Sequence, residues 1–314
     1  MQSLRKTVLL TALVTLSLGL ALAQRRERGW RGFWGDDSAG PMIRTEGGVL
    51  VNEDTVRTVR ETTAHSTDTP NWMNEPGFEK DVFTFTRIIF KSSPGRPGRF
   101  GWINDYPDSD LNLSYRLQQL TSLKVDPDGR VLKLTDPALF GAPMIHMAKP
   151  GRMILREEEA SALRKYLLAG GTLMADDFWG ADEWDNFEEQ MKQVLPERGW
   201  VELPMEHPVF HCVYDLKVPK SKLQVPYIRA GLSSLDPSSP NFGNSAQFAG
   251  EDMKEMHVRA WLDDRQRLMI ITTHNTNNGD GWEREAEDEG YFRQYSENRA
   301  YPLAINIIFY VMTH

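Results

Sequence analysis

Residues 144–175 read MIHMAKPGRMILREEEASALRKYLLAGGTLMA, and this stretch decides the fold. Residues 144–148 and 172–175 are short apolar runs typical of buried strands. Residues 157–169 predict a helix between them, with an apolar face and a terminal glycine pair: Ala160, Leu163, Leu167 and Gly170-Gly171. Two strands joined by a helix usually lie parallel, with a right-handed crossover. The stretch therefore predicts an α/β domain with a mostly parallel sheet.

Segments outside this stretch extend the same pattern. Further strands are expected at residues 82–90, 209–213, 258–262 and 268–273. Helices are expected to begin at the capping residues Asp110 and Asp182, because a carboxylate there accepts hydrogen bonds from free N–H groups. A last apolar helix runs from Pro302 to Met312 and is too short to cross a bilayer. Residues 231–252, rich in Ser, Pro, Gly and Asn, are interpreted as an insertion.

The N-terminus predicts export. Residues 1–23 have a basic head, an apolar stretch and the tripeptide Ala21-Leu22-Ala23, which is the form that signal peptidase cuts. The mature chain is then expected to begin at Gln24, to lie in the periplasm or outside the cell, and to have no membrane span. An uncleaved anchor is the alternative, because four arginines follow within residues 25–31. Residues 24–79 predict a loosely ordered arm or linker, and residues 80–314 the α/β domain.

The net charge and the cysteine content indicate which partners and which kind of stabilisation to expect. The whole chain has a net charge of −8, and the signal peptide contains two basic and no acidic residues, so the mature chain is more acidic still. A phosphate backbone would be repelled, and nucleic acid is not expected as a partner. Cys212 is the only cysteine. No internal disulfide can therefore form, and stability must come from a packed core.

Three motifs in order resemble one family. They are DYPDSDLNLSYRLQQL at residues 105–120, LAGGTLMADDFW at residues 168–179 and HPVFH at residues 207–211. With them, the sequence from about residue 80 to the end resembles the domain of unknown function DUF4159. The resemblance implies a class I glutamine amidotransferase-like fold, a flavodoxin-like three-layer α/β/α sandwich, and brings no known activity.

The same resemblance argues against glutaminase chemistry. Active class I amidotransferases carry a nucleophilic cysteine on a glycine-flanked turn after a central strand. Here Asp176-Asp177 follow the strand at 172–175, and Cys212 has no flanking glycine. A nucleophile elbow needs small neighbours to project its side chain from a strained turn. We therefore expect no cysteine nucleophile in this domain.

Polar residues follow several of the predicted strands. Asp105, Asp176, Asp177 and His274 are expected near the carboxyl edge of the sheet, where open α/β sheets form ligand crevices. Gathered there, they would suit a divalent cation or a general acid and base. The alternative is that the aspartates only cap turns, because Asp is favoured in turns for local reasons.

A histidine pair gives a second candidate site. His207 and His211 lie four residues apart, and Asp215 is the one nearby residue that could complete a metal site. Pro208 makes an ordinary turn the alternative.

A polar loop gives a third candidate site, this one for a saccharide. Asn275 and Asp280 could bind hydroxyl groups, and Trp282, with Trp179 and Trp184, could pack on a sugar ring. The alternative is a solvated loop with Trp282 packed inward. The acidic run 283–289 is expected on the surface.

Two functions from different classes remain open. The first is a non-catalytic, envelope-associated module that binds a protein or a saccharide ligand at the sheet edge. The second is a hydrolase, metal-assisted or not, that acts on carbohydrate of the envelope or on imported carbohydrate. No motif in the sequence implies a specific cofactor.

Overall fold

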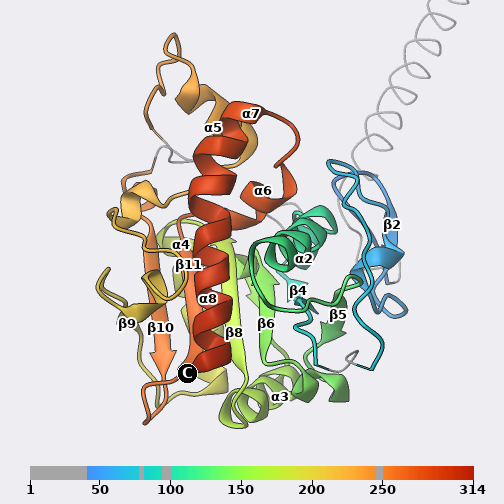
Figure 1. Ribbon diagram of the computed structural model, residues 1–314. Helices are drawn as coiled ribbons and strands as arrows, with labels where there is room; N and C mark the ends of the chain where they lie inside the picture. The colour runs from blue at the N-terminus through green and yellow to red at the C-terminus, as the bar shows by residue number, and fades with distance from the viewer. Residues whose placement is uncertain (1–40, 78–80, 94–100, 245–249) are drawn as a thin grey trace, which may run out of the picture. The chain divides into compact units, whose positions relative to one another are not determined.

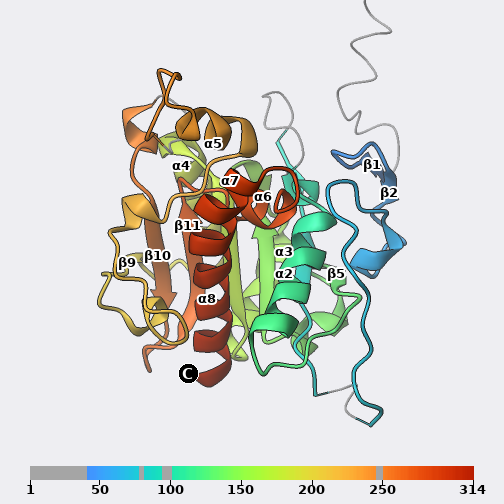
Figure 2. The same cartoon turned by 45° about the horizontal axis from the view of Figure 1, so that its top comes forward.

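The computed structural model describes residues 41–77, 81–93, 101–244 and 250–314. The chain divides into two compact units, Met1–Ile43 and Arg44–His314. The predicted signal peptide and the first part of the predicted arm lie outside the described residues. The second unit holds a seven-stranded sheet. Helices lie on both faces of this sheet (Figures 1 and 2).

The sheet is mostly parallel, as predicted. Its strand order is β5-β3-β6-β8-β11-β10-β9. The strands are β3 (Thr86–Ile89), β5 (Arg130–Lys133), β6 (Met144–Ala148), β8 (Thr172–Phe178), β9 (Val201–Glu202), β10 (His257–Leu262) and β11 (Leu268–His274). The first five in spatial order run parallel, β10 pairs antiparallel with β11, and β9 pairs antiparallel with β10. The short strands β1 (Met42–Arg44), β2 (Leu50–Asn52), β4 (Lys91–Ser92) and β7 (Met153–Ile154) lie outside it.

Helices cover both faces of the sheet, which is consistent with the predicted sandwich. α2 (Asp108–Leu120), α6 (Asn278–Glu283) and α8 (Tyr301–Thr313) lie on one face, and α3 (Glu157–Leu168) and α4 (Gly180–Val194) on the other (Figures 1 and 2). α5 (Ile228–Leu235) lies beyond the carboxyl ends of the parallel strands. α7 (Glu289–Tyr291), the π-helix η8 (Phe292–Ala300) and α8 follow one another without a break.

The C-terminal helix supplies much of the core. Leu303, Ile305 and Ile308 of α8 are fully buried in one cluster with Met174 of β8 and Ile271 of β11. Burying each such side chain contributes about 1.5–3 kcal/mol. Pro302 is the second residue of α8, which directly follows the end of the π-helix η8. Among the described helices, none combines the length and the apolar composition that a membrane crossing requires.

Several predicted elements need correction. Residues 209–213 are not a strand: Pro208 starts the short 3₁₀-helix η5 (Pro208–Phe210), which buries Val209 and Phe210. The strand predicted at 82–90 is shorter, because only Thr86–Ile89 joins the sheet. The edge strand β5 was missed, since four residues give too short a pattern.

The two predicted helix caps were also wrong. α2 begins before Asp110, whose carboxylate instead pairs with the fully buried Arg87. α4 begins at Gly180, and Glu183 rather than Asp182 accepts a hydrogen bond from the Trp179 N–H, at 2.9 Å.

Residues 44–77 of the predicted arm belong to the same compact unit as the domain. The carboxylate of Asp108, on α2, accepts hydrogen bonds from the backbone N–H groups of His65, Ser66 and Thr67 at 2.9–3.1 Å. The Trp72 indole N–H donates to the Val125 carbonyl oxygen at 2.9 Å. The loosely ordered arm expected from composition is therefore replaced, over these residues, by a segment with specific hydrogen bonds to the domain.

Candidate functional site

Four connections at the carboxyl edge of the sheet contain a non-glycine residue with left-handed backbone. Asp105 (φ 59°) lies between β3 and α2, Lys149 (φ 54°) follows β6, Asp177 (φ 59°) is the second-to-last residue of β8, and Asn275 (φ 61°) follows β11. Asp and Asn tolerate this conformation better than most residues, but it still costs free energy. Such residues gather at functional sites more often than elsewhere. This edge is therefore the candidate site.

Asp105 and Asp177 lie together at this edge. The Asn104 side-chain N–H₂ group donates to Asp105 Oδ1 at 2.7 Å and to Asp177 Oδ2 at 2.8 Å. Lys149 Nζ lies 3.4 Å from Asp177 Oδ2, and the Trp179 indole N–H donates to Asp177 Oδ1 at 3.0 Å. Both oxygens of Asp177 thus have partners.

Asp176 points toward α6 and positions that helix. Its Oδ1 accepts hydrogen bonds from Thr273 Oγ1 at 2.5 Å and from Asn278 Nδ2 at 2.8 Å, and its Oδ2 accepts one from the Gly279 N–H at 3.0 Å. Burial raises its pKa to about 7. Since both oxygens already have protein donors, Asp176 is a structural link between β8 and α6.

The polar loop predicted at residues 274–282 is a buried helical turn. The Asn277 side chain caps α6 by accepting a hydrogen bond from the Asp280 N–H at 2.8 Å. Trp282 is fully buried and packs near Phe85 and His146. It cannot contact a sugar ring in this conformation, so the alternative of an inward-packed Trp282 is the correct one.

Asn275 also has a structural role. Its side chain donates to the carbonyl oxygens of Asp252 and Glu255, both at 2.8 Å, and accepts a hydrogen bond from the Gly180 N–H at 2.8 Å. It is fully buried. Asn275 therefore joins three segments of the chain and is not exposed to a ligand.

Two further carboxyl groups border Asp105. Asp280 accepts a hydrogen bond from the Ile228 N–H at 2.5 Å, at the start of α5. Glu283 is fully buried, which corrects the expectation that the acidic run 283–289 is all surface. The physical reason is that residue 283 ends α6 on its inner side, beside Arg284 and His65.

Burial and mutual repulsion disfavour the ionised forms of this group. Burial, together with Asp280 and Asp177, raises the pKa of Asp105 well above its ordinary range. Burial, Asp105 and Asp280 do the same for Glu283, and burial raises the pKa of Asp280 to about 7. Perturbed carboxyl groups of this kind are typical of functional sites, although structural ion-pair networks also produce them.

His274 does not join these carboxyl groups. Its Nε2 lies 3.0 Å from the Gly180 carbonyl oxygen, and its ring packs on Phe178 and Trp184. Burial lowers its pKa to about 3. The Arg259 guanidinium lies over the Trp184 ring, 3.9 Å from the ring centroid, in a cation–π contact. His274 and Trp184 thus belong to an aromatic cluster that includes Phe187 of α4.

The histidines of the predicted metal site form hydrogen bonds to residues close to them in the sequence. The His207 side chain accepts a hydrogen bond from the Val209 N–H at 3.2 Å. His211 uses Nδ1 for Asp215, at 2.7 Å, and Nε2 for the Met205 carbonyl oxygen, at 2.6 Å. Within the described parts of the chain, the residue groups with metal-ligand spacing lie elsewhere: His65, Asp108 and Glu283, and Glu46, Asp105 and Glu283. The sequence pattern missed Glu46, His65 and Glu283.

A family model for a domain of unknown function, DUF4159, matches residues 94–312. The chain belongs to the DUF4159 family. The matched residues include all four residues with left-handed backbone at the carboxyl edge of the sheet: Asp105, Lys149, Asp177 and Asn275. A comparison with curated proteins finds no match.

The single cysteine of this DUF4159 protein is not arranged as a nucleophile. Cys212 Sγ lies 3.1 Å from the Asn306 carbonyl oxygen, as a donor, and burial raises the pKa of its thiol. The neighbouring His211 has both ring nitrogens engaged by other groups. A reactive cysteine instead needs a lowered pKa and an available base.

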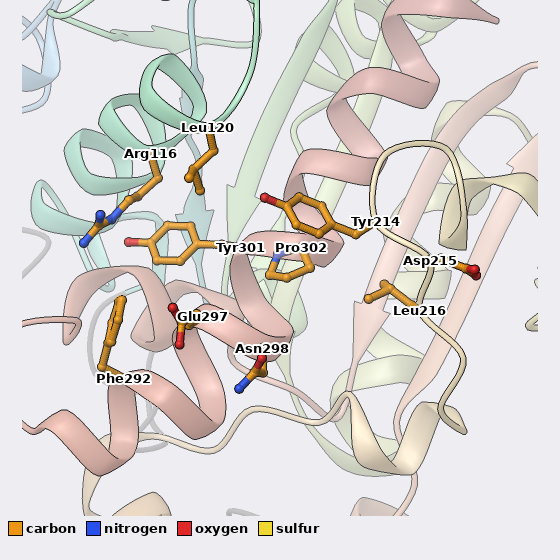
Figure 3. Close-up of a pocket in the computed structure, with 10 residues that line it drawn as sticks. All are labelled: Arg116, Leu120, Tyr214, Asp215, Leu216, Phe292, Glu297, Asn298, Tyr301 and Pro302. Carbon is orange, nitrogen blue, oxygen red and sulfur yellow. The ribbon is translucent and has the colours of Figure 1, made fainter.

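A pocket of about 490 Å³ lies apart from the carboxyl groups, beside α2, η8 and the start of α8 (Figure 3). Figure 3 shows Arg116, Tyr301 and Phe292 on one side and Tyr214 and Leu216 on the other. Arg116 Nε lies 2.9 Å from Glu285 Oε2 and the Tyr301 hydroxyl donates to the same oxygen at 2.7 Å. The Arg116 guanidinium and the Tyr301 hydroxyl in this pocket therefore already have a protein partner.

Proposed function

We propose that this DUF4159 protein is an exported, envelope-associated binding module that holds a positively charged ligand, without cleaving it, at the carboxyl edge of its sheet. The observation that carries the proposal is the excess of buried carboxyl groups at that edge. Asp105, Asp177, Asp280 and Glu283 are at most 4 % exposed. A carboxyl group this deeply buried is readily ionised only beside a positive charge. Lys149 and Arg284 are too few to pair with all four groups, and Arg87 already pairs with Asp110.

The strand order supports this location. Starting from β3, the chain goes first to β5 on one side and then to β6 on the other. This is the order of flavodoxin-like sheets, in which ligands bind at the point where the chain changes sides. Asp105 and Lys149 follow the two strands at that point. The order also agrees with the proposed glutamine amidotransferase-like superfamily, whose nucleophile this chain lacks.

A hydrolase receives less support from the geometry. The imidazole expected to act with the aspartates, His274, hydrogen-bonds the Gly180 carbonyl oxygen and packs against α4. Both oxygens of Asp176 are occupied by donors of the protein itself. The pair of an aspartate and the His274 imidazole, expected from the sequence to act as acid and base, is therefore not assembled around Asp105 in the described residues.

A thermal-shift screen of the purified protein tests the proposal. The probes are MnCl₂, spermidine and soluble peptidoglycan fragments, each with the wild type, Asp105→Asn and the exposed control Asp185→Asn. A ligand that binds only the folded state raises the melting temperature. We expect at least one probe to raise it for the wild type and the control but not for Asp105→Asn.

Two results would reject this function. One is a wild-type melting temperature that none of the probes changes. The other is cleavage of the peptidoglycan fragments, followed by mass spectrometry, by the wild type and not by Asp105→Asn, which would establish the hydrolase instead.

A further inference from the structure

Three carboxyl groups from distant parts of the sequence meet beside the carboxyl edge of the sheet. Glu46, Asp105 and Glu283 each offer a ligand atom, and these atoms lie within 4.8 Å of one another. Oxygen ligands of one Ca²⁺ ion, bound at about 2.3–2.6 Å, can lie up to roughly 5 Å apart. The three groups can therefore bind one ion without a large rearrangement.

The inner part of this cluster has one oxygen atom without a partner. Asp105 Oδ2 has no hydrogen-bond partner among the described residues, whereas the Glu283 oxygens lie 2.8 Å from Arg284 Nε and 3.3 Å from His65 Nε2. Asp105 is 2 % exposed, so bulk water does not replace the missing partner. Leaving a buried polar atom unpaired costs free energy, and more when it is charged.

Asp105 Oδ2 also lies unusually close to the backbone of α6, at Gly279. A Cβ atom placed on Gly279 would lie 2.2 Å from this oxygen. Only glycine at position 279 lets the carboxyl group approach α6 so closely. Asp105 itself has left-handed backbone, which directs its side chain into the cluster at a cost in conformational energy.

The charge in the cluster is not balanced. The Arg284 guanidinium lies 2.6 Å from Glu46, 2.8 Å from Glu283 and 3.8 Å from Asp280. One guanidinium thus stands among three carboxyl groups, with Asp105 as a fourth beside them. A divalent cation would remove most of the remaining negative charge.

The other possible ligand group is already satisfied. His65, Asp108 and Glu283 have metal-ligand spacing too. Asp108, however, accepts hydrogen bonds from three backbone N–H groups, from Ser66 Oγ and from His65 Nδ1. It fixes the segment around residue 66 to α2. The unpartnered Asp105 Oδ2 favours the group of Glu46, Asp105 and Glu283.

We infer that Glu46, Asp105 and Glu283 bind one divalent cation of the class that prefers oxygen ligands, such as Ca²⁺, Mg²⁺ or Mn²⁺. This inference rests on the proposed function and names the ligand class of the same site. Carboxylate ligands without thiolate or imidazole are typical of these ions. The exposed Glu46 gives the ion a route from solvent to the buried pair.

Mn²⁺ titration of the purified, EDTA-treated protein tests the inference at pH 7.5, with calorimetry and with the electron paramagnetic resonance signal of free Mn²⁺. We expect one ion per chain. Asp105→Asn and Glu283→Gln are expected to weaken binding at least about tenfold, and the exposed Glu46→Gln to weaken it as well. The controls Asp185→Asn and Glu189→Gln change exposed carboxylates on α4 and should bind like the wild type.

Glu46→Gln keeps the test informative if a buried variant fails to fold, because residue 46 is on the surface. Absence of Mn²⁺ binding to the wild type, or binding that Asp105→Asn and Glu46→Gln leave unchanged, overturns the inference. If Mn²⁺ fails while spermidine or a peptidoglycan fragment stabilises the protein in an Asp105-dependent way, only the cation site is rejected. If every probe fails, the binding function falls with it.

Discussion

The pKa of Asp105 links the site to the stability of the fold. Burial, followed by the carboxyl groups of Asp280 and Asp177, raises the pKa of Asp105, and the nearby cations Lys149 and Arg87 only partly oppose this. The folded protein therefore holds the Asp105 proton more tightly than the unfolded chain does. The stability that protonated Asp105 contributes is complete below its ordinary pKa of 3.8 and is lost as the pH rises through its raised pKa.

Asp105→Asn should consequently stabilise the metal-free protein at pH 8 and have less effect at pH 5. The amide keeps the shape of the side chain but cannot ionise. The gain is expected to amount to up to about 1.4 kcal/mol for each pH unit by which the pKa is raised. Urea unfolding at both pH values measures it, with Asp185→Asn as the control. An equal effect of Asp105→Asn at the two pH values would contradict the placement of a strained carboxylate here.

His146 shows the opposite pH dependence. It is 1 % exposed on β6, neither ring nitrogen has a hydrogen-bond partner among the described residues, and burial followed by Arg87 lowers its pKa well below 6.5. Its stability contribution is complete above pH 6.5 and is lost as the pH falls toward the lowered pKa. His146→Leu cannot titrate, so relative to the wild type it should gain stability between pH 7.5 and pH 5.

Urea unfolding of wild type and His146→Leu at these two pH values measures the relative gain, which should reach up to about 1.4 kcal/mol for each pH unit. The comparison between pH values separates titration from packing, because any change in packing is the same at both. A stability difference that does not move with pH would mean that His146 finds a proton acceptor.

α8 fixes a loop as well as the core. The Asn306 side chain accepts hydrogen bonds from the Val213 and Tyr214 N–H groups, at 3.1 and 2.7 Å, and donates to the Tyr214 carbonyl oxygen at 2.8 Å. It is fully buried. These three bonds attach the loop at residues 213–214 to α8.

Asn306→Ala should lower the free energy of unfolding by about 1–3 kcal/mol, because it removes three part-buried hydrogen bonds to the backbone of Val213 and Tyr214. Asn298→Ala, an exposed substitution on η8, is the matched control and should cost much less. Urea unfolding with both variants measures the difference. Equal losses for the two would show that the loop does not depend on Asn306.

The elements that could be predicted were those with a strong local pattern. β6, α3 and β8 follow directly from the sequence of residues 144–175. η5 was mistaken for a strand because Val209 and Phe210 are apolar, while Pro208 and burial under α8 decided the outcome. α6 was read as a loop because its polar residues face buried carboxylates, a partnership that no local pattern records.

The site could be predicted only in part. The strand ends indicated Asp105, Asp176 and Asp177, and the structure places all three at one edge, although Asp176 serves α6. Glu46 and Glu283 were missed, because they reach Asp105 through contacts between segments far apart in the sequence. Glu283 also lies in an acidic run, and the composition of that run is typical of a solvated surface.

Export belongs to the chain as a whole and is tested on the mature N-terminus. The small residues at Ala21 and Ala23 predict cleavage before Gln24. Mass analysis of the protein recovered from its native host should show a first residue of Gln24, in the soluble envelope fraction. An intact Met1 on membrane-bound protein would establish an anchor instead.

The position of the bound ion is the most direct test of a cation site at Asp105. Crystals of the protein soaked in MnCl₂ and measured at a wavelength where manganese scatters anomalously would show where the ion binds. We expect one strong anomalous peak between the carboxyl groups of Glu46, Asp105 and Glu283. A peak beside His211 and Asp215, or no peak near Asp105 at millimolar Mn²⁺, would contradict it.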